Sequence, residues 1–253
     1  MRKSVYLMVS LLLIVFVFFG CVNPELSKEV QKPGLSFRVL LPDTTTATQI
    51  YVVGEMNNWK LDNVWVLNVT DVDGKKYAIG EYDLPEASIT GGVEFRYKYL
   101  IGKSWDNVEM KKDGSSDIKN RFVYVNENLR NIVNDAVLNW KGEDLVNPAT
   151  STITVKFIAY VPDTTPDGSV VQLVGDMNGW NGEDMVKEGN VWTITKQLES
   201  NTYYEFKLRL KNESNAWAYP EGNETGGYED NRALILNDDA TIVILKVHSW
   251  ENM

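Results

Sequence analysis

A six-residue pattern occurs twice in this chain, and the duplication limits what the chain can fold into more than any other feature. Residues 54–59 are Gly-Glu-Met-Asn-Asn-Trp, and residues 175–180 are Gly-Asp-Met-Asn-Gly-Trp. Each copy follows a short run rich in apolar residues, at 51–53 and at 172–174. A pattern that recurs at a long period is typical of a duplicated structural unit. We therefore expect two copies of one domain.

Further landmarks recur in the same order in both halves, which makes chance similarity a poor explanation. They are the Pro-Asp-Thr segments that begin at Pro42 and Pro162, the Glu-Phe segments that begin at Glu94 and Glu205, Trp105 and Trp217, Asn120-Arg121 and Asn231-Arg232, and Trp140 and Trp250. The separation between the copies shrinks along the chain, and loops absorb such deletions far better than packed elements do.

These landmarks predict a first repeat over residues 35–142 and a second repeat over residues 150–253. Each repeat has about 100 residues, a common size for a domain with its own core. Residues 143–149 between them are polar and contain a proline, which is typical of a short linker.

The N-terminal segment predicts export rather than fold. Two basic residues precede an apolar run over residues 5–19, which ends at Gly20-Cys21. This order resembles a bacterial lipoprotein signal. We expect residues 1–20 to be the signal peptide, Cys21 to carry the lipid and residues 21–34 to be a polar tether. The alternative is an uncleaved membrane anchor. Both place the repeats outside the cytoplasm, in the periplasm or at the cell surface.

The charge balance argues against two classes of partner, and the cysteine content excludes a disulfide within the chain. Without Arg2 and Lys3 the chain has 23 basic and 35 acidic residues, a net charge of −12. Such a balance argues against nucleic acid and anionic lipid headgroups as partners, so we expect contact with a membrane only through the lipid anchor. Cys21 is the single cysteine, so no disulfide forms within the chain.

Hydrophobic residues alternate with a period of two in both repeats, as in residues 154–161. This period is typical of half-buried β-strands. We predict an all-β fold of two tandem immunoglobulin-like antiparallel β-sandwiches. Besides the first strand of each repeat, the expected strands are 49–54, 64–70, 77–83, 92–101, 121–126 and 134–140 in the first repeat, and 169–174, 191–197, 202–211, 232–237 and 241–247 in the second. Residues 71–74 and 187–190 are expected turns, and 71–74 fits a hairpin better than a calcium loop.

The chain has few residues typical of catalysis. His248 is its single histidine, and no partnered base or cluster of metal ligands recurs in both repeats. Paired carboxylates for glycoside hydrolysis remain open, because 35 acidic residues are present. We expect no enzyme activity, no cofactor and no bound metal.

Tryptophan, by contrast, is abundant, with eight residues in the chain. Trp105 and Trp217 lie in polar loops, where an exposed indole ring can stack on a pyranose while polar neighbours bind its hydroxyl groups. The alternative is that these rings cap the ends of the sandwiches. The remaining tryptophans outside the duplicated pattern, Trp65, Trp140, Trp192 and Trp250, are expected in cores, sheet faces or strand ends.

The order of these landmarks resembles carbohydrate-binding modules of family 48 and the glycogen-binding domain of AMP-activated kinase β subunits. In those domains the pattern is usually Gly-x-Phe-Asn-x-Trp, so Met56 and Met177 are departures. The family binds α-1,4-glucans through two tryptophans, a lysine and an asparagine. The resemblance therefore implies a carbohydrate-binding site in each repeat: Trp59, Lys98, Trp105 and Asn120 in the first, and Trp180, Arg209, Trp217 and Asn231 in the second.

Arg209 stands for the lysine in this alignment, and the second repeat has a longer loop from Pro220 to Gly227. We therefore expect its site to differ from the first or to be lost. The resemblance implies a lipid-anchored protein that holds starch, glycogen or maltooligosaccharide for a separate hydrolase or transporter. The alternative is an assembly protein whose sandwiches dock to a glucan-active enzyme or envelope partner without binding sugar.

Overall fold

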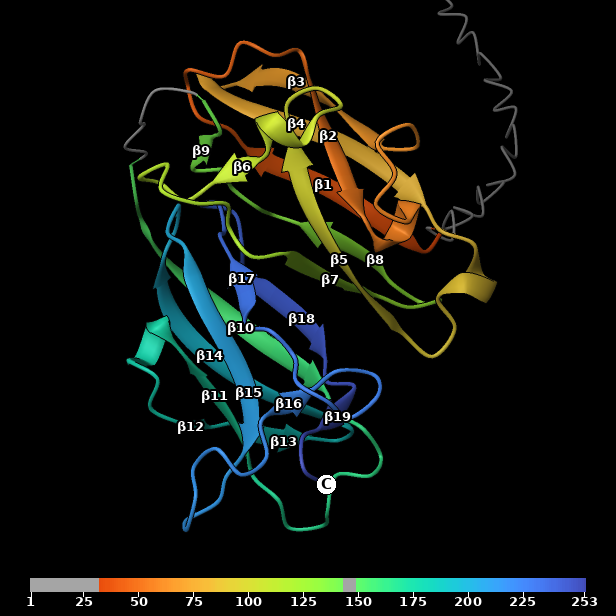
Figure 1. The fold of residues 1–253 in the computed structure, drawn as a ribbon, viewed down its shortest axis with the longest axis vertical. Coiled ribbons are helices and arrows are strands. Elements are labelled where there is room, and N and C mark those ends of the chain that lie inside the picture. Colours follow the sequence, from red (N-terminus) through yellow and green to blue (C-terminus); the bar gives the residue numbers. More distant parts are fainter. Residues whose placement is uncertain (1–31, 143–148) are drawn as a thin grey trace, which may run out of the picture. The chain divides into compact units, whose positions relative to one another are not determined.

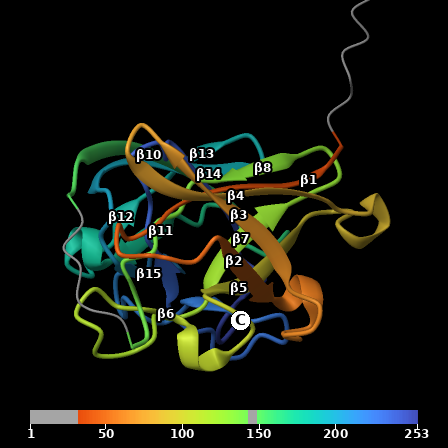
Figure 2. The same ribbon diagram turned by 90° about the horizontal axis from the view of Figure 1, so that it is seen from above.

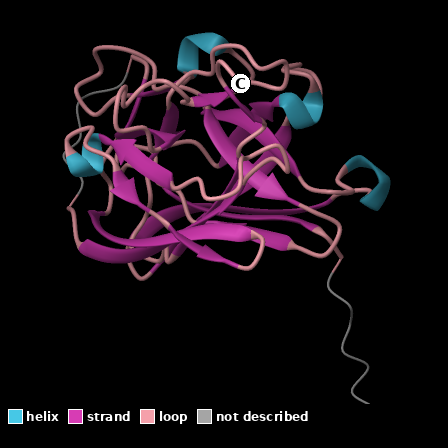
Figure 3. Ribbon diagram, turned by 90° about the horizontal axis from the view of Figure 1, so that it is seen from below, coloured by secondary structure: helices cyan, strands magenta, loops and turns pink. Residues whose placement is uncertain are grey.

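Alternating apolar side chains form buried strand faces in both repeats. In β1 (Gly34–Leu40) and in β10 (Thr152–Tyr160) every second side chain is buried, beginning with Leu35 and Ile153. Figures 1 and 3 show that strands make up nearly all of the regular structure. The prediction of an all-β sandwich fold is confirmed.

The computed structural model describes residues 32–142 and 149–253. Within these residues the helical elements are three-residue 3-10 turns, among them η1 (Glu55–Asn57), η3 (Trp105–Asn107) and η4 (Asp176–Asn178). The other strands of the first repeat are β2 (Gln49–Gly54), β3 (Trp65–Val72), β4 (Lys75–Asp83), β5 (Val93–Leu100), β6 (Glu109–Met110), β7 (Arg121–Val125), β8 (Arg130–Val133) and β9 (Asn139–Trp140). Those of the second are β11 (Val171–Gly175), β12 (Glu183–Asp184), β13 (Val186–Glu188), β14 (Val191–Glu199), β15 (Tyr204–Leu210), β16 (Glu221–Gly222), β17 (Arg232–Leu234), β18 (Ile242–Lys246) and β19 (Ser249–Trp250).

The first repeat is one seven-stranded sheet that folds over on itself, in the order β7-β5-β2-β3-β4-β1-β8. In Figure 2, β8, β1 and β4 lie together on one side, and β2, β5 and β7 lie on the other. The start of β3 pairs with β2 and its end pairs with β4, so this strand joins the two layers. Phe37 of β1 packs edge-to-face on Tyr97 and Tyr99 of β5 in the core between the layers.

The second repeat has the same layers as two separate sheets, β13-β14-β10-β18 and β12-β11-β15-β17. The position of β3 is taken here by two short strands, β12 and β13, on either side of buried Met185. The turn before β14 contains Gly189 at φ 64°, and the matching turn before β4 contains Asp73 and Gly74 at φ 55° and 78°. Both predicted turns are confirmed, and residues 71–74 form a hairpin.

Two predictions about the strands need correction. The expected continuous strand over 134–140 is wrong: the chain pairs earlier, as β8, and then only through isolated bridges at Asp135 and Ala136 and the two residues of β9. The pairing is also not purely antiparallel, because β1 pairs with β8 in parallel and β10 pairs with β18 in parallel. In each repeat a strand late in the chain, β8 or β18, thus pairs with the first strand, β1 or β10, and forms the edge of that layer.

The two repeats contact each other through buried groups of the described chain, all within one compact unit, Lys32–Met253. Phe122 of β7 belongs to the hydrophobic core of the second repeat and packs edge-to-face on Phe206, with ring centroids 5.7 Å apart. Glu94 of β5 is ion-paired with Arg232 of β17 and accepts a 2.9 Å hydrogen bond from the backbone of Lys246. These contacts fix the junction of the repeats.

Several predictions about the ends of the domains fall outside the described residues. These are the signal peptide at 1–20, the lipidation site Cys21, most of the tether at 21–34, and all but the last residue of the linker at 143–149. The division of the chain into these segments stays a prediction. In the described part of the chain, no helix is long and apolar enough to span a membrane.

Candidate functional site

The duplicated pattern folds into the same loop in both repeats, and its shared glycine, asparagine and tryptophan each have a structural task. Gly54 lies so close to β5 that a Cβ atom would meet the Arg96 carbonyl oxygen at 2.3 Å; at Gly175 the Glu205 carbonyl would be met at 2.5 Å. Because these distances are far below any normal contact, only glycine fits. The glycine recurs because two backbone segments approach each other closely at this position.

The asparagine of the pattern ties the loop closed. Asn57 accepts a hydrogen bond from the Gly54 backbone at 2.9 Å and donates one to the Val52 carbonyl at 3.0 Å. Asn178 makes the matching bonds in the second repeat, both at 2.9 Å. A buried amide that satisfies two backbone groups in this way fixes the conformation of the residues after it.

The loop then presents its tryptophan in a strained backbone conformation. Trp59 has φ 57° and Trp180 has φ 63°, in the left-handed region that large side chains rarely occupy. Each is held by a hydrogen bond from its own N–H to the glycine carbonyl, at 2.8 Å in both repeats. Strain of this kind clusters at functional sites, where the surrounding structure maintains it.

The structure brings the predicted tryptophans together in pairs. The first tryptophan pair, Trp59 and Trp105, has ring centroids 6.2 Å apart and tilted by 32°. The second tryptophan pair, Trp180 and Trp217, has centroids 6.3 Å apart and tilted by 42°. Trp105 is 40% exposed and Trp217 is 42% exposed, whereas their partners are half-buried. Each repeat thus has a tilted aromatic platform with one open ring.

Lys98 lies on the outer face of β5, beside the first tryptophan pair. Tyr97 and Tyr99 point into the core, so Lys98 and Leu100 point outward, and Leu100 packs in the small cluster that includes Trp59. The Lys98 ammonium donates to the carbonyl of Ile118. Burial lowers the pKa of Lys98. Lys98 is half-buried, so part of its surface stays open to solvent.

The predicted equivalence of Lys98 and Arg209 is wrong. Lys98 lies opposite Val53 in the ladder, and the residue opposite the matching Val174 is Lys207. Lys207 also donates to the backbone carbonyl of Glu229, as Lys98 does to that of Ile118. The predicted alignment of β5 with β15 was therefore wrong by two residues. A shift of two residues leaves every side chain on the same face of the sheet, so the alternation of apolar and polar residues does not reveal the error. Arg209 corresponds to Leu100.

Both outward cations of β15 are covered by aromatic rings. The guanidinium of Arg209 lies 4.9 Å from the ring centroid of Trp217, and the ammonium of Lys207 lies 4.5 Å from that of Tyr228. Lys207 is 4% exposed and Arg209 is 6% exposed, whereas Tyr228 is 66% exposed. Tyr228 is not among the site residues that the sequence predicts. The signal that could have found it is an aromatic residue in the long loop, directly before the Asn231 segment.

The two predicted asparagines line one cavity, which we name the junction cavity. It has a volume of about 270 Å³ and lies between the repeats, lined by Arg96, Lys98, Lys119, Asn120, Glu229, Asp230 and Asn231. Asn120 is exposed, and Asn231 donates a 2.9 Å hydrogen bond to Glu205. Asn120 and Lys98 therefore share this cavity, while the tryptophans of the first repeat are not among its lining residues.

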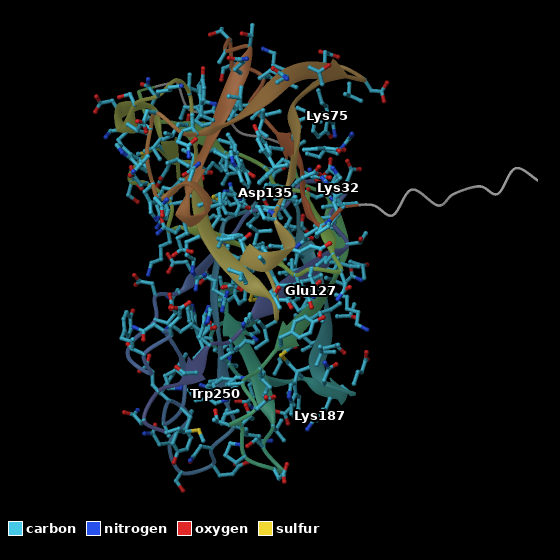
Figure 4. All side chains as sticks on the ribbon, turned by 90° about the vertical axis from the view of Figure 1, so that its right-hand side faces the viewer. Lys32, Lys75, Glu127, Asp135, Lys187 and Trp250 are labelled. Carbon is cyan, nitrogen blue, oxygen red and sulfur yellow. The ribbon has the colours of Figure 1, made fainter. Side chains whose placement is uncertain are left out.

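The other tryptophans are structural, as predicted. Trp140 and Trp250 are buried, and their indole N–H groups donate to Thr45 and Thr165 at 2.9 and 2.8 Å. Figure 4 labels Trp250 within the strands of the second repeat. Trp192 is likewise buried in the second core, and Trp65 stacks on Tyr82 with ring centroids 4.3 Å apart.

The described residues offer little for catalysis or metal binding. They contain no cluster of three metal-ligating side chains. His248 lies 3.9 Å from an oxygen of exposed Glu224 and is not part of either tryptophan platform. The buried carboxylates Glu94, Glu109 and Glu221 are instead ion-paired with Arg232 or Arg121. Such pairing suits a structural role.

No protein-family model matches the chain, and no characterised protein matches it in sequence. Among solved structures, a gamma-CGTase from alkalophilic Bacillus clarkii is similar at 13% identity with a TM-score of 0.31, over 87% of this chain and 28% of that one. A family CBM26 module from Eubacterium rectale, solved in complex with maltoheptaose, is similar at 10% identity with a TM-score of 0.29, over 87% of this chain and 94% of that one. Similarities this weak carry no argument about family or function, and the resemblance to family 48 stays a prediction.

Proposed function

We propose that this protein binds α-glucans without catalysis, through one site in each repeat, while a lipid at Cys21 anchors it to the bacterial cell envelope. The observation that carries the proposal is the duplicated tryptophan pair. Two independent repeats hold an indole in a left-handed conformation and set a second, open indole 6.2 or 6.3 Å away. A core function does not need open rings, whereas stacking on sugar rings does.

The polar groups beside each pair suit the hydroxyl groups of a glucose unit. In the first repeat Lys98, which lies opposite Val53 of the Trp59 cluster, provides a donor, and Asn120 lies with Lys98 in the junction cavity. In the second repeat the platform of Trp180 and Trp217 rests on Arg209. The ligand proposed here is starch, glycogen or a maltooligosaccharide, which a separate hydrolase or transporter would then process.

The test is binding of the mature protein to insoluble starch and to maltoheptaose. We expect Trp105→Ala and Trp217→Ala each to weaken starch retention and the double variant to abolish it. Trp105→Phe and Trp217→Phe are the matched controls, because they keep an aromatic face. Quenching of indole fluorescence by maltoheptaose in the wild type provides a second readout.

Wild-type protein that binds neither starch nor maltoheptaose, with unchanged fluorescence, would contradict the proposal. That outcome would favour the alternative in which the same faces dock to a glucan-active enzyme. The open surface of Trp105 and Trp217 would then be an interface for protein rather than for sugar.

A further inference from the structure

The outer face of β15 carries a continuous row of groups that leads from the second tryptophan pair to the junction cavity. Phe206, Leu208 and Leu210 point into the core, so Glu205, Lys207 and Arg209 share the outer face. Trp217 lies over Arg209 and Tyr228 lies over Lys207. Residues two apart on a strand are separated by about 7 Å. The two open rings are therefore supported at neighbouring positions of one row.

The third position of the row, Glu205, contacts two residues that line the junction cavity. Glu205 accepts hydrogen bonds from Tyr203 and Asn231, both at 2.9 Å, and lies 3.6 Å from the ammonium of Lys119. Asn231 and Lys119 line the cavity. From the other side, β5 of the first repeat contributes Arg96 and Lys98 to the same cavity. The cavity therefore lies between the outer face of β5 and the residues that contact Glu205 of β15.

Tyr228 is held rigidly although its ring is open. Its carbonyl accepts a 3.0 Å hydrogen bond from Asn223, its backbone bridges to Gly222, and its hydroxyl lies 3.4 Å from Asp230. The Asn223 carboxamide oxygen also accepts from the backbone of Thr225 and Gly227, both at 3.0 Å. A fixed aromatic ring binds a ligand at low entropic cost, because few rotamers are lost.

The composition of the cavity rim suits a sugar better than an ion. Lys119 and Arg96 are already paired with Glu205, Asp230, Glu94 or Glu229, so neither sign of charge is in excess. What the rim presents is a mixture of amide, carboxylate and ammonium groups beside an open ring. Neutral polyhydroxylated molecules are recognised by such alternating donors and acceptors next to an apolar face.

We propose that Tyr228 and the junction cavity form a further α-glucan-binding subsite, which extends the site of the second repeat toward the first. The inference rests on the proposed function, since it requires that the second tryptophan pair binds glucan. It also explains the long loop of the second repeat, which places an aromatic ring where the first repeat leaves its lysine half-exposed. A chain longer than one platform would then contact both repeats.

The experiment is isothermal titration calorimetry of the mature protein in a Trp105→Ala background, with maltotriose and maltoheptaose as ligands. We expect Tyr228→Ala to weaken maltoheptaose binding about fivefold to tenfold, in line with the loss of one stacked ring, and to change maltotriose binding by less than about twofold. Tyr228→Phe keeps the ring and should bind maltoheptaose nearly as the background does. Val186→Ala, at another exposed apolar position, is the control for a surface change.

Lys119→Ala provides a second approach from the first repeat, since it alters the cavity and its ion pairs with Glu205 and Asp230 while the Tyr228 ring itself stays in place. We expect it to weaken maltoheptaose binding about threefold and to leave maltotriose unchanged. A Tyr228→Ala variant that binds maltoheptaose as tightly as the background, or that loses both ligands equally, would overturn the inference. Failure of the background protein to bind either ligand would instead overturn the proposed function of the second repeat.

Discussion

At the scale of single residues, Lys98 and Lys207 occupy equivalent positions but differ in what their ammonium groups can reach. Lys98 is half-buried at the rim of the junction cavity, whereas Lys207 is 4% exposed beneath Tyr228. Burial lowers the pKa of both groups. The lysine of the first repeat can therefore contact a ligand directly, and that of the second supports an aromatic ring instead.

This difference predicts unequal effects of the same substitution. In a Trp217→Ala background, Lys98→Met should weaken maltoheptaose binding about tenfold, because a hydrogen bond to a charged group contributes roughly 1.5–3 kcal/mol. In a Trp105→Ala background, Lys207→Met should leave binding within about threefold, since methionine still fills the space below Tyr228. Calorimetry measures both, and a larger loss for Lys207→Met than for Lys98→Met would contradict the assignment.

At the scale of elements, the loop after β2 and its counterpart after β11 are the features that the sequence predicts best. Glycine, asparagine and tryptophan recur because close approach, backbone pairing and ring presentation each need one residue type. The longer loop of the second repeat is evident from the sequence, but the position of Tyr228 over Lys207 could not be predicted in this way, because it occurs in one repeat only. The two-residue error in aligning β5 with β15 could not be detected from the sequence either, since both alignments bury the same kinds of side chain.

The closing asparagine should be necessary for the loop. Asn57→Ala leaves the Gly54 N–H and the Val52 carbonyl without their partner in a buried site. We expect the free energy of unfolding to fall by about 2–4 kcal/mol, and the first repeat to lose maltoheptaose binding in a Trp217→Ala background. Urea denaturation and calorimetry measure the two effects.

The chain itself offers the control for this loop. Asn58 has φ 56°, and the second repeat has Gly179 with φ 60° at the same place. Asn58→Gly should therefore change stability by less than about 1 kcal/mol, because glycine adopts this conformation freely. If Asn58→Gly proved as harmful as Asn57→Ala, the stability of the loop would not depend on the asparagine hydrogen bonds.

At the scale of the whole molecule, the junction of the repeats depends on buried charge. Burial by itself raises the pKa of the Glu94 carboxyl, but Arg232 and Arg96 outweigh it and hold the pKa below its ordinary value of 4.5. A carboxyl whose pKa is lower in the folded state stabilises the fold above its unfolded pKa. Its contribution is lost as the pH falls through the folded value.

Replacing this carboxylate should weaken the protein and flatten its response to acid. Glu94→Gln leaves part of the charge of Arg232 uncompensated, so we expect a loss of about 3 kcal/mol in unfolding free energy at pH 7. Below about pH 4.5 the difference from wild type should begin to shrink, because the Glu94 carboxyl of the unfolded chain is then protonated, and it should vanish once the pH falls below the lower pKa of the folded state. Urea denaturation at pH 7 and pH 3.5 measures both. Glu213→Gln, whose side chain is 88% exposed, is the control, and an equal loss at both pH values would contradict the role of the Glu94 charge.

Phe122 has a consequence for how such a protein can change over evolution. Its side chain completes the core of the second repeat although its backbone belongs to the first. A gene fusion that copied the second repeat alone would leave that core incomplete. The unit that can be copied with both cores complete is therefore the pair of repeats, and a new arrangement of this protein would gain or lose both tryptophan pairs together.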